Sequence, residues 1–186
     1  ADIANFTYRV LSFAERNTAS KTTTYSEPEL EKQLKRKYDE IKSAYLYYNT
    51  REAVKLILEV GSIGNKYFQD NKPWEMMKTP GNEKRMHEII SFCVNMIKDL
   101  SILIKPVMPR FSEKLEKQLN LKDLAWKDLD ITLKNHKLGK SAILVKKIEN
   151  ELDKFAVKDP FSMLDLRVAE VLEAKKHPQA DKLLVL

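Results

Sequence analysis

The chain has 186 residues, enough for one helical domain of about 100–150 residues and part of a second domain. It carries 33 Lys and Arg against 27 Asp and Glu, a net charge of +6 that is compatible with a polyanionic partner without establishing one. The four glycines form no phosphate-binding motif, which disfavours nucleotide hydrolysis by this chain. One cysteine excludes an intrachain disulfide, and three scattered histidines offer no metal-ligand spacing.

The sequence contains no signal-peptide pattern, and no apolar run approaches the roughly 18 residues of a membrane-spanning helix. We therefore expect a cytoplasmic protein that does not contact a membrane. The chain starts at Ala1-Asp2, inside a helical pattern and without Met, so we expect it to be a piece of a larger protein.

Apolar spacing at three and four residues predicts an up-down bundle of five helices. The expected ranges are 2–17, 26–48, 51–70, 82–105 and 109–120. Ser26 to Glu29 have the pattern of a capping box, and Tyr48 is expected to close the apolar face of the second helix. Gly61 and Gly64 each cost the third helix up to about 1 kcal/mol relative to Ala. We expect the close approach of a neighbouring helix or a ligand to compensate.

Beyond the bundle the pattern changes. Residues 129–138 lack helical periodicity, residues 141–155 are expected to form another helix, and seven lysines against three acids lie between Lys134 and Lys158. After Asp159-Pro160, a strand pattern at Leu166, Val168 and Val171 precedes a turn over 177–181 and a second apolar strand from Leu183. This divides the chain into a bundle (1–125), a basic linker with a helix (126–158) and a β segment (159–186).

Two groups of residues suggest a binding site. The segment Asn65 to Trp74 ends a helix in polar residues and presents Pro73-Trp74 at a corner. There Trp74 would serve as a stacking platform for a nucleobase, worth about 1–3 kcal/mol, or would fold back onto the bundle. On the first helix Arg9, Ser12 and Arg16 form one polar stripe, where Arg can address a base edge with its planar fork or simply face solvent.

The pattern N-x-Y-x-x-x-x-x-P-W and the run from Asn5 to Arg16 resemble the anticodon-binding domain of methionyl-tRNA synthetases. Residues 103–109, 136–140 and 146–151 are also similar to that family. In the family an Asn, an Arg four residues later and the Trp of the corner read the first anticodon base, a cytosine. The Arg maps to Arg16 and the Trp to Trp74, whereas Ser12 stands where the family has Asn.

The resemblance implies a mainly α fold, a helical bundle of the class I synthetase anticodon-binding type. It implies that the chain binds the CAU anticodon of tRNA(Met) for a methionine–tRNA ligase. That parent enzyme would use ATP and Mg²⁺ in a catalytic domain absent here, so we expect no cofactor and no catalysis in this chain. The anticodon-binding residues would be Ser12, Arg16, Pro73 and Trp74. Candidate tRNA backbone contacts are Arg9, Lys66, Lys72, Lys137 and Lys140.

The segment Asp165-Leu-Arg-Val-Ala-Glu-Val171, followed by His177-Pro-Gln-Ala-Asp-Lys-Leu183, resembles the opening of the tRNA-binding OB module appended to many of these enzymes. Arg167 and Lys182 would contact tRNA there, although Arg167 and Asp181 could instead pair structurally within a barrel. An OB fold needs five strands and only two are present, so we expect a truncated module. Its apolar surface should pack against the bundle or pair with a second copy of the chain.

Two rival interpretations stay open. The chain could be a helical protein-interaction module with Trp74 as its hydrophobic anchor. It could also be the anticodon domain of another class I synthetase for an aliphatic amino acid, although the OB-like opening argues against this. Cys93 lies on an apolar stripe and is expected in the core, whereas His87 and His136 are expected to be surface or partly packed residues.

Overall fold

The computed structural model describes residues 2–129, 131–145, 170–179 and 182–185. The chain forms two compact units, residues 1–146 and 147–186, which are treated separately. The elements in order are α1 (Asp2–Asn17), α2 (Pro28–Leu46), α3 (Thr50–Asn71), α4 (Pro73–Met76), α5 (Glu83–Ile104), α6 (Pro109–Gln118), η1 (Trp126–Asp128), β1 (Lys175–Lys176) and β2 (Leu184–Val185).

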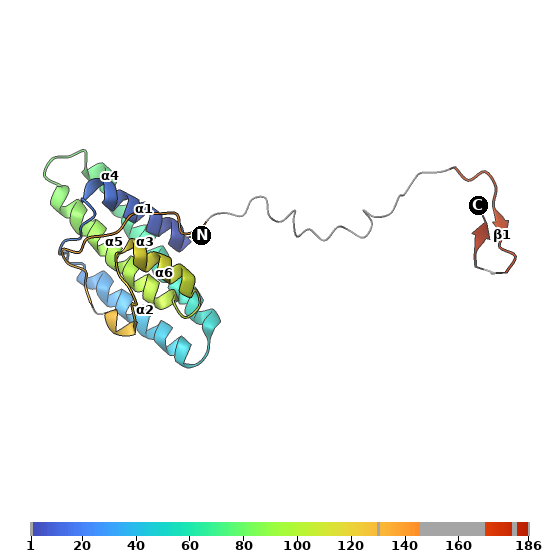
Figure 1. Cartoon of the computed structure of the whole chain (residues 1–186), viewed down its shortest axis with the longest axis horizontal. Helices are drawn as coiled ribbons and strands as arrows, with labels where there is room; N and C mark the ends of the chain where they lie inside the picture. Colours follow the sequence, from blue (N-terminus) through green and yellow to red (C-terminus); the bar gives the residue numbers. More distant parts are fainter. Residues whose placement is uncertain (1, 130, 146–169, 180–181, 186) are drawn as a thin grey trace. The chain divides into compact units, whose positions relative to one another are not determined.

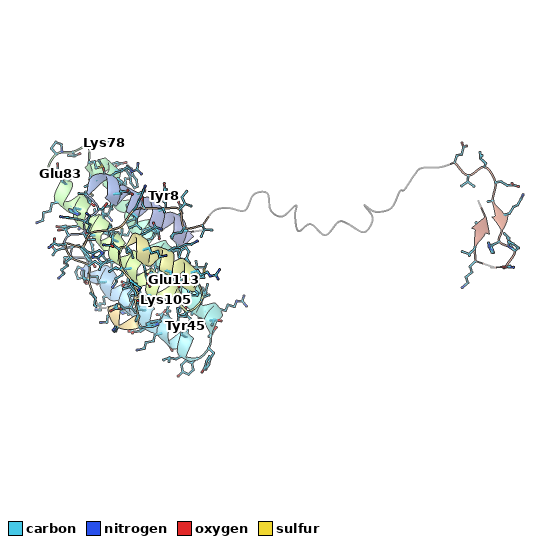
Figure 2. The ribbon with its side chains drawn as sticks, in the orientation of Figure 1. Tyr8, Tyr45, Lys78, Glu83, Lys105 and Glu113 are labelled. Atoms are coloured by element: carbon cyan, nitrogen blue, oxygen red, sulfur yellow. The ribbon has the colours of Figure 1, made fainter. Side chains whose placement is uncertain are left out.

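The first unit is a bundle of the five long helices α1, α2, α3, α5 and α6, which confirms the predicted fold (Figure 1). Helix α3 lies against α1, α2 and α5, and α6 lies against α5. The short helix α4 packs on α5. Lys78 and Glu83, next to α4, lie at one end of the bundle, and Tyr45 and Lys105 lie towards the other (Figure 2).

Helix α5 is buried around its whole circumference. Sixteen of its 22 residues are buried, including the predicted core residue Cys93. A helix that is apolar on all sides needs neighbours on all sides. Helices α1, α3 and α6 supply three of them, and the irregular segment after α6 supplies another.

Helices α1 and α3 approach closely and run in the same direction. A Cβ atom at Gly61 would lie 2.9 Å from Ile3 Cγ1, and one at Gly64 would lie 2.7 Å from Phe6 Cζ and 3.0 Å from Met96 Cε. The glycines therefore make room for a neighbouring helix, as one of the two explanations from the sequence required.

The irregular segment after α6, here called the wrapping segment (residues 121–129 and 131–145), lies on the bundle. Its buried leucines anchor it, and these are Leu124, Leu133, Leu138 and Leu144. The helix expected from Ser141 is not formed over residues 141–145. The amide of Ser141 donates to the Glu15 carboxylate, and the amide of Ala142 donates to the Gln118 side chain. These amides therefore bond side chains of the bundle and do not form helical hydrogen bonds. The rest of that expected helix lies outside the described residues.

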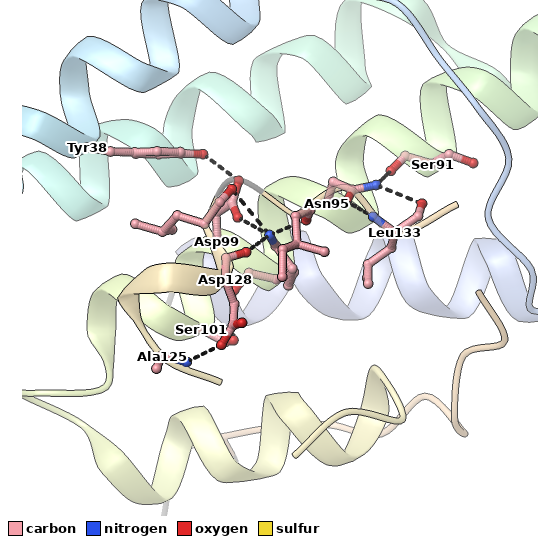
Figure 3. Close-up of polar contacts among 11 residues, drawn as sticks. Tyr38, Ser91, Asn95, Asp99, Ser101, Ala125, Asp128 and Leu133 are labelled. Atoms are coloured by element: carbon pink, nitrogen blue, oxygen red, sulfur yellow. Dashed lines mark hydrogen bonds and ion pairs between the residues drawn. The ribbon is translucent and has the colours of Figure 1, made fainter. Parts of the chain in front are cut away.

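Two polar side chains of α5 hold the wrapping segment (Figure 3). The Asn95 amide oxygen accepts from the Leu133 amide at 2.7 Å. The Lys98 side chain is almost completely buried, and its ammonium donates to the carbonyl oxygens of Asp128, Leu129 and Ile131. It also lies 2.8 Å from Asp99 Oδ1. A buried ammonium is thus satisfied by three carbonyls and a carboxylate.

Asp99 joins this network to α2, because the Tyr38 hydroxyl donates to Asp99 Oδ2 at 2.9 Å (Figure 3). Burial, and then the adjacent Asp99 charge, raise the pKa of Tyr38 well above its ordinary value. The phenol therefore stays protonated and remains a donor over the whole physiological range.

Two details of α2 differ from expectation. Its first turn contains Pro28, as predicted, but Glu27 occupies the cap position and its side chain does not cap the helix. The Glu27 carboxylate instead accepts from the Tyr67 hydroxyl and pairs with Arg85. At the other end, Tyr48 does not extend the apolar face: it has φ 56° in the turn before α3 and is 91% exposed.

In the second unit β1 and β2 pair antiparallel, with Lys175 opposite Val185 and Lys176 opposite Leu184. The His177 amide donates to the Leu183 carbonyl, and β2 lies where the second apolar strand was predicted. Val171 lies outside any strand, because the first paired strand begins only at Lys175. Leu166 and Val168 lie outside the described residues. Within the described part of the chain, no helix is long and apolar enough to cross a membrane.

Gly64→Ala should destabilise the bundle even though Ala is the better helix former. Phe6 is fully buried and Met96 closes the other side, so the added methyl must displace packed atoms. We expect a loss of about 1–3 kcal/mol in the free energy of unfolding, measured by chemical denaturation. Ser62→Ala, at an exposed position of the same helix, is the control and should change little. An unchanged or higher stability for Gly64→Ala would contradict the close α1–α3 contact.

Lys98→Met should be strongly destabilising, because the buried carbonyls of the wrapping segment lose their donor and Asp99 loses its ion-pair partner. Removing one partner of a buried charged pair typically costs about 3–5 kcal/mol. The exposed Lys84→Met on the same helix is the matched control for the lost charge. Equal denaturation midpoints for the two variants would show that Lys98 does not hold the segment.

Candidate nucleic-acid interface

The corner that carries Trp74 is formed by a single left-handed residue. Helix α3 ends at Asn71, Lys72 adopts φ 44° and ψ 58°, and Pro73 is the first residue of α4. Proline suits this position because its missing N–H would be unpaired in the first turn anyway. The chain therefore changes direction within one residue and places Trp74 beside the last turns of α3.

The Trp74 ring is partly buried against Phe68, with ring centroids 5.7 Å apart and an angle of 58° between the planes. Phe68 is itself almost fully buried. Trp74 thus combines features of both interpretations from the sequence: one part of the ring rests on the bundle, and another part remains accessible.

Arg16 lies exposed in the last turn of α1. Its Nε donates to the Ser12 carbonyl at 3.0 Å, which uses neither of the two terminal nitrogens suited to a bidentate contact. Ser12 is buried, and its hydroxyl donates to the Tyr8 carbonyl of its own helix. The expected exposed stripe through Arg9, Ser12 and Arg16 is therefore wrong at Ser12, because the face that carries Ser12 turns towards the bundle.

Arg9 is engaged within the protein. Its Nη1 donates to Asn65 Oδ1 at 3.0 Å and its Nη2 donates to Gln69 Oε1 at 2.8 Å. Its guanidinium carbon lies 5.3 Å from the centroid of the Phe68 ring. Phe68 and Gln69 were not recognised in the sequence. The spacing of Asn65 and Gln69, one helical turn apart with Phe68 between them, was the available signal.

Basic residues of the wrapping segment meet the end of α1. Lys137 forms a β-bridge with Lys21, and the Leu138 amide donates to the Ser20 carbonyl. Glu15 accepts from the hydroxyl and amide of Ser141, and these bonds lower the pKa of the Glu15 carboxyl, with smaller contributions from Lys140 and Arg16. Lys140 and Arg16 therefore lie near the same carboxylate.

The other candidate lysines are exposed. Lys66 lies on α3, and Lys72 at the corner has its ammonium 3.5 Å from Glu75. Lys182 is exposed in the second unit, and Arg167 lies outside the described residues.

His87 and His136 are partly buried and each bonds a backbone carbonyl, so neither is aimed at solvent as a free ligand. Among the described residues, no three His, Cys, Asp or Glu side chains gather as a metal site would require.

The bundle resembles solved tRNA synthetases. Apo methionyl-tRNA synthetase from Mycobacterium tuberculosis superposes with a TM-score of 0.70 at 16% identity, over 79% of this chain and 32% of that one. The complex of the same enzyme with methionyl-adenylate gives 0.70 at 18% identity, over 79% and 31%. At such identities the likeness concerns the fold alone.

The sequence relatives of this chain are methionine–tRNA ligases. Methionine–tRNA ligase of Francisella tularensis is 30% identical over 189 residues, covering 86% of this chain and 28% of that protein. A probable cytoplasmic methionine–tRNA ligase of Dictyostelium discoideum is 29% identical over 201 residues, covering 100% of this chain and 27% of that protein. This chain thus spans little more than a quarter of the length of these relatives.

Residues 18–160 match the family model of the anticodon-binding domain of methionyl-tRNA ligase. This match covers most of the chain, which therefore belongs to the family of methionyl-tRNA ligase anticodon-binding domains.

Proposed function

We propose that this chain binds the CAU anticodon of tRNA(Met) and positions that tRNA for aminoacylation by a catalytic domain outside the chain. The observation that carries the proposal is the corner itself. A partly accessible Trp74 rests on a buried Phe68, and Arg16 is exposed on the neighbouring parallel helix of a chain in this family.

Each residue would have a separate role. Trp74 would stack on the unpaired first anticodon base, because single-stranded bases of RNA are recognised by stacking on aromatic rings. Pro73 would hold the ring at the corner. Arg16 would address the edge of the cytosine with its terminal nitrogens, and the buried Ser12 would contribute through its position beneath Arg16.

Four lysines would supply the affinity that does not depend on sequence. These are Lys66, Lys72, Lys137 and Lys140, all exposed. Contacts to phosphate fix the register of a nucleic acid without reading it, and they weaken as salt is added. A protein partner anchored on Trp74 would show a much weaker dependence on salt.

The parent protein would be a cytoplasmic methionine–tRNA ligase that uses ATP and Mg²⁺, bound outside this chain. The names of the relatives support this activity, and that of the Dictyostelium protein supports the compartment. The hairpin of β1 and β2 would open a tRNA-binding OB module, with Arg167 and Lys182 near the tRNA. The unpaired outer edges of β1 and β2 would favour self-association of the chain.

Trp74→Ala should weaken tRNA(Met) binding by about 1–3 kcal/mol, the loss of one base–aromatic stack. A modest loss of stability will accompany it, since the ring also packs on Phe68. Binding is measured by fluorescence anisotropy of labelled tRNA. The control is Trp126→Ala, which removes a partly buried Trp that packs on Tyr45, near the other end of the bundle. Equal binding by both variants and the parent chain would overturn the stacking role.

Arg16→Ala should reduce the preference for CAU over an anticodon altered at its first base, because a good bidentate contact discriminates by about 1–3 kcal/mol. The measurement is the ratio of two dissociation constants at fixed salt. Arg110→Ala, at an exposed position of α6, is the control for a lost positive charge. Equal weakening with both tRNAs would make Arg16 a phosphate contact only.

A further inference from the structure

We propose that Arg9 is a positioning residue that fixes Trp74 relative to Arg16, and that it does not itself contact the tRNA. This inference rests on the proposed function, because it assigns Arg9 a part in the same recognition site. It differs from the role of a phosphate contact that the position of Arg9 on an outer helix suggests. Three observations carry it, and they concern hydrogen bonding, ring packing and helix connection.

The first observation is that both terminal nitrogens of the Arg9 guanidinium already donate hydrogen bonds within the protein. Nη1 donates to the amide oxygen of Asn65 and Nη2 to that of Gln69, at 3.0 and 2.8 Å. These acceptors stand one turn apart on α3, which suits the planar fork of Arg and not the single ammonium of Lys. These two bonds join α1 to α3 and fix the plane of the guanidinium against α3.

The second observation is that Arg9 and Trp74 share one ring. Arg9 lies 5.3 Å from the Phe68 centroid, within the range of a cation–π contact, and Trp74 lies 5.7 Å from the same centroid. Phe13 of α1 packs edge-on against Phe68 as well, at 6.2 Å. Phe68 is almost fully buried, so any tilt of this ring moves the surface on which Trp74 rests.

The third observation is the connection between the helices. Arg9 and Arg16 lie two turns apart on α1, and Trp74 follows the end of α3 after only Lys72 and Pro73. The spacing between Arg16 and Trp74 therefore depends on how the last turns of α3 sit against α1. Arg9 bonds α3 at those turns, and so holds the two proposed base contacts at one separation.

The test is a double-mutant cycle of Arg9→Met and Trp74→Ala in the whole chain, measured as binding to tRNA with CAU and with an altered first base. Met keeps an unbranched apolar stem and removes the fork. With Trp74 present, Arg9→Met should reduce the CAU preference about 5- to 10-fold, as is typical of coupled neighbours. In the Trp74→Ala chain the same change should have less than about a twofold effect.

A second readout needs no tRNA. In a Trp126→Phe background Trp74 is the sole tryptophan, and Arg9→Met should shift its emission and increase its quenching by acrylamide. Gln69→Leu removes one acceptor at an exposed position and should act in the same direction, more weakly. It also serves as the test if Arg9→Met fails to fold. Arg36→Met, exposed on α2, controls for the lost charge and should change neither the emission nor the acrylamide quenching of Trp74.

Several results would overturn the inference. One is a preference unchanged by Arg9→Met, and another is an equal effect with and without Trp74. A third is a shallower salt dependence for Arg9→Met with full recovery in Arg9→Lys, which would indicate a phosphate contact. If the parent chain itself shows no CAU preference, the proposed function fails. The quenching measurement then still decides whether Arg9 positions the Trp74 ring.

Discussion

The structure depends on the burial of the middle and the C-terminal turns of α5. A helix with a single apolar stripe needs neighbours on one side only, but α5 needs them on every side. It nevertheless carries an amide and an ammonium in its middle. Asn95 and Lys98 are tolerated there because an irregular segment presents backbone groups to them. The wrapping segment is thus the partner that the central helix requires.

That requirement has a consequence for the candidate site. Asn95 and Lys98 hold the backbone of Asp128, Leu129, Ile131 and Leu133. The residues that follow Leu133 cross the end of α1, where the Leu138 amide bonds the Ser20 carbonyl. This path of the backbone places Lys137 and Lys140 near the end of α1, where Arg16 is exposed. The basic charge beside the site is therefore placed by contacts in the core, over a stretch that the sequence suggested was a linker.

The sequence was informative wherever one local rule decides the structure. Periodic apolar residues placed five helices within a few residues of their ends, and Gly64 marked a close contact of helices. Pro73 and Trp74 marked the corner, where proline and a left-handed residue determine the turn. In each case neighbouring residues carry the whole signal, and tertiary packing only has to agree with it.

Other features could not be read locally. The Ser141 region resembles a helix in composition, but its amides bond Glu15 and Gln118, which are distant in sequence. Ser12 fits a polar stripe by spacing, yet it turns inward because α1 is buried over more of its surface than an amphipathic helix with one apolar face. Arg9 bonds Asn65 and Gln69 only because α1 and α3 run parallel in one particular axial register. Gly64 permits that register because, without a Cβ atom, it leaves space for the Phe6 ring. The packing that forms the core therefore also determines the geometry of the candidate site at the corner.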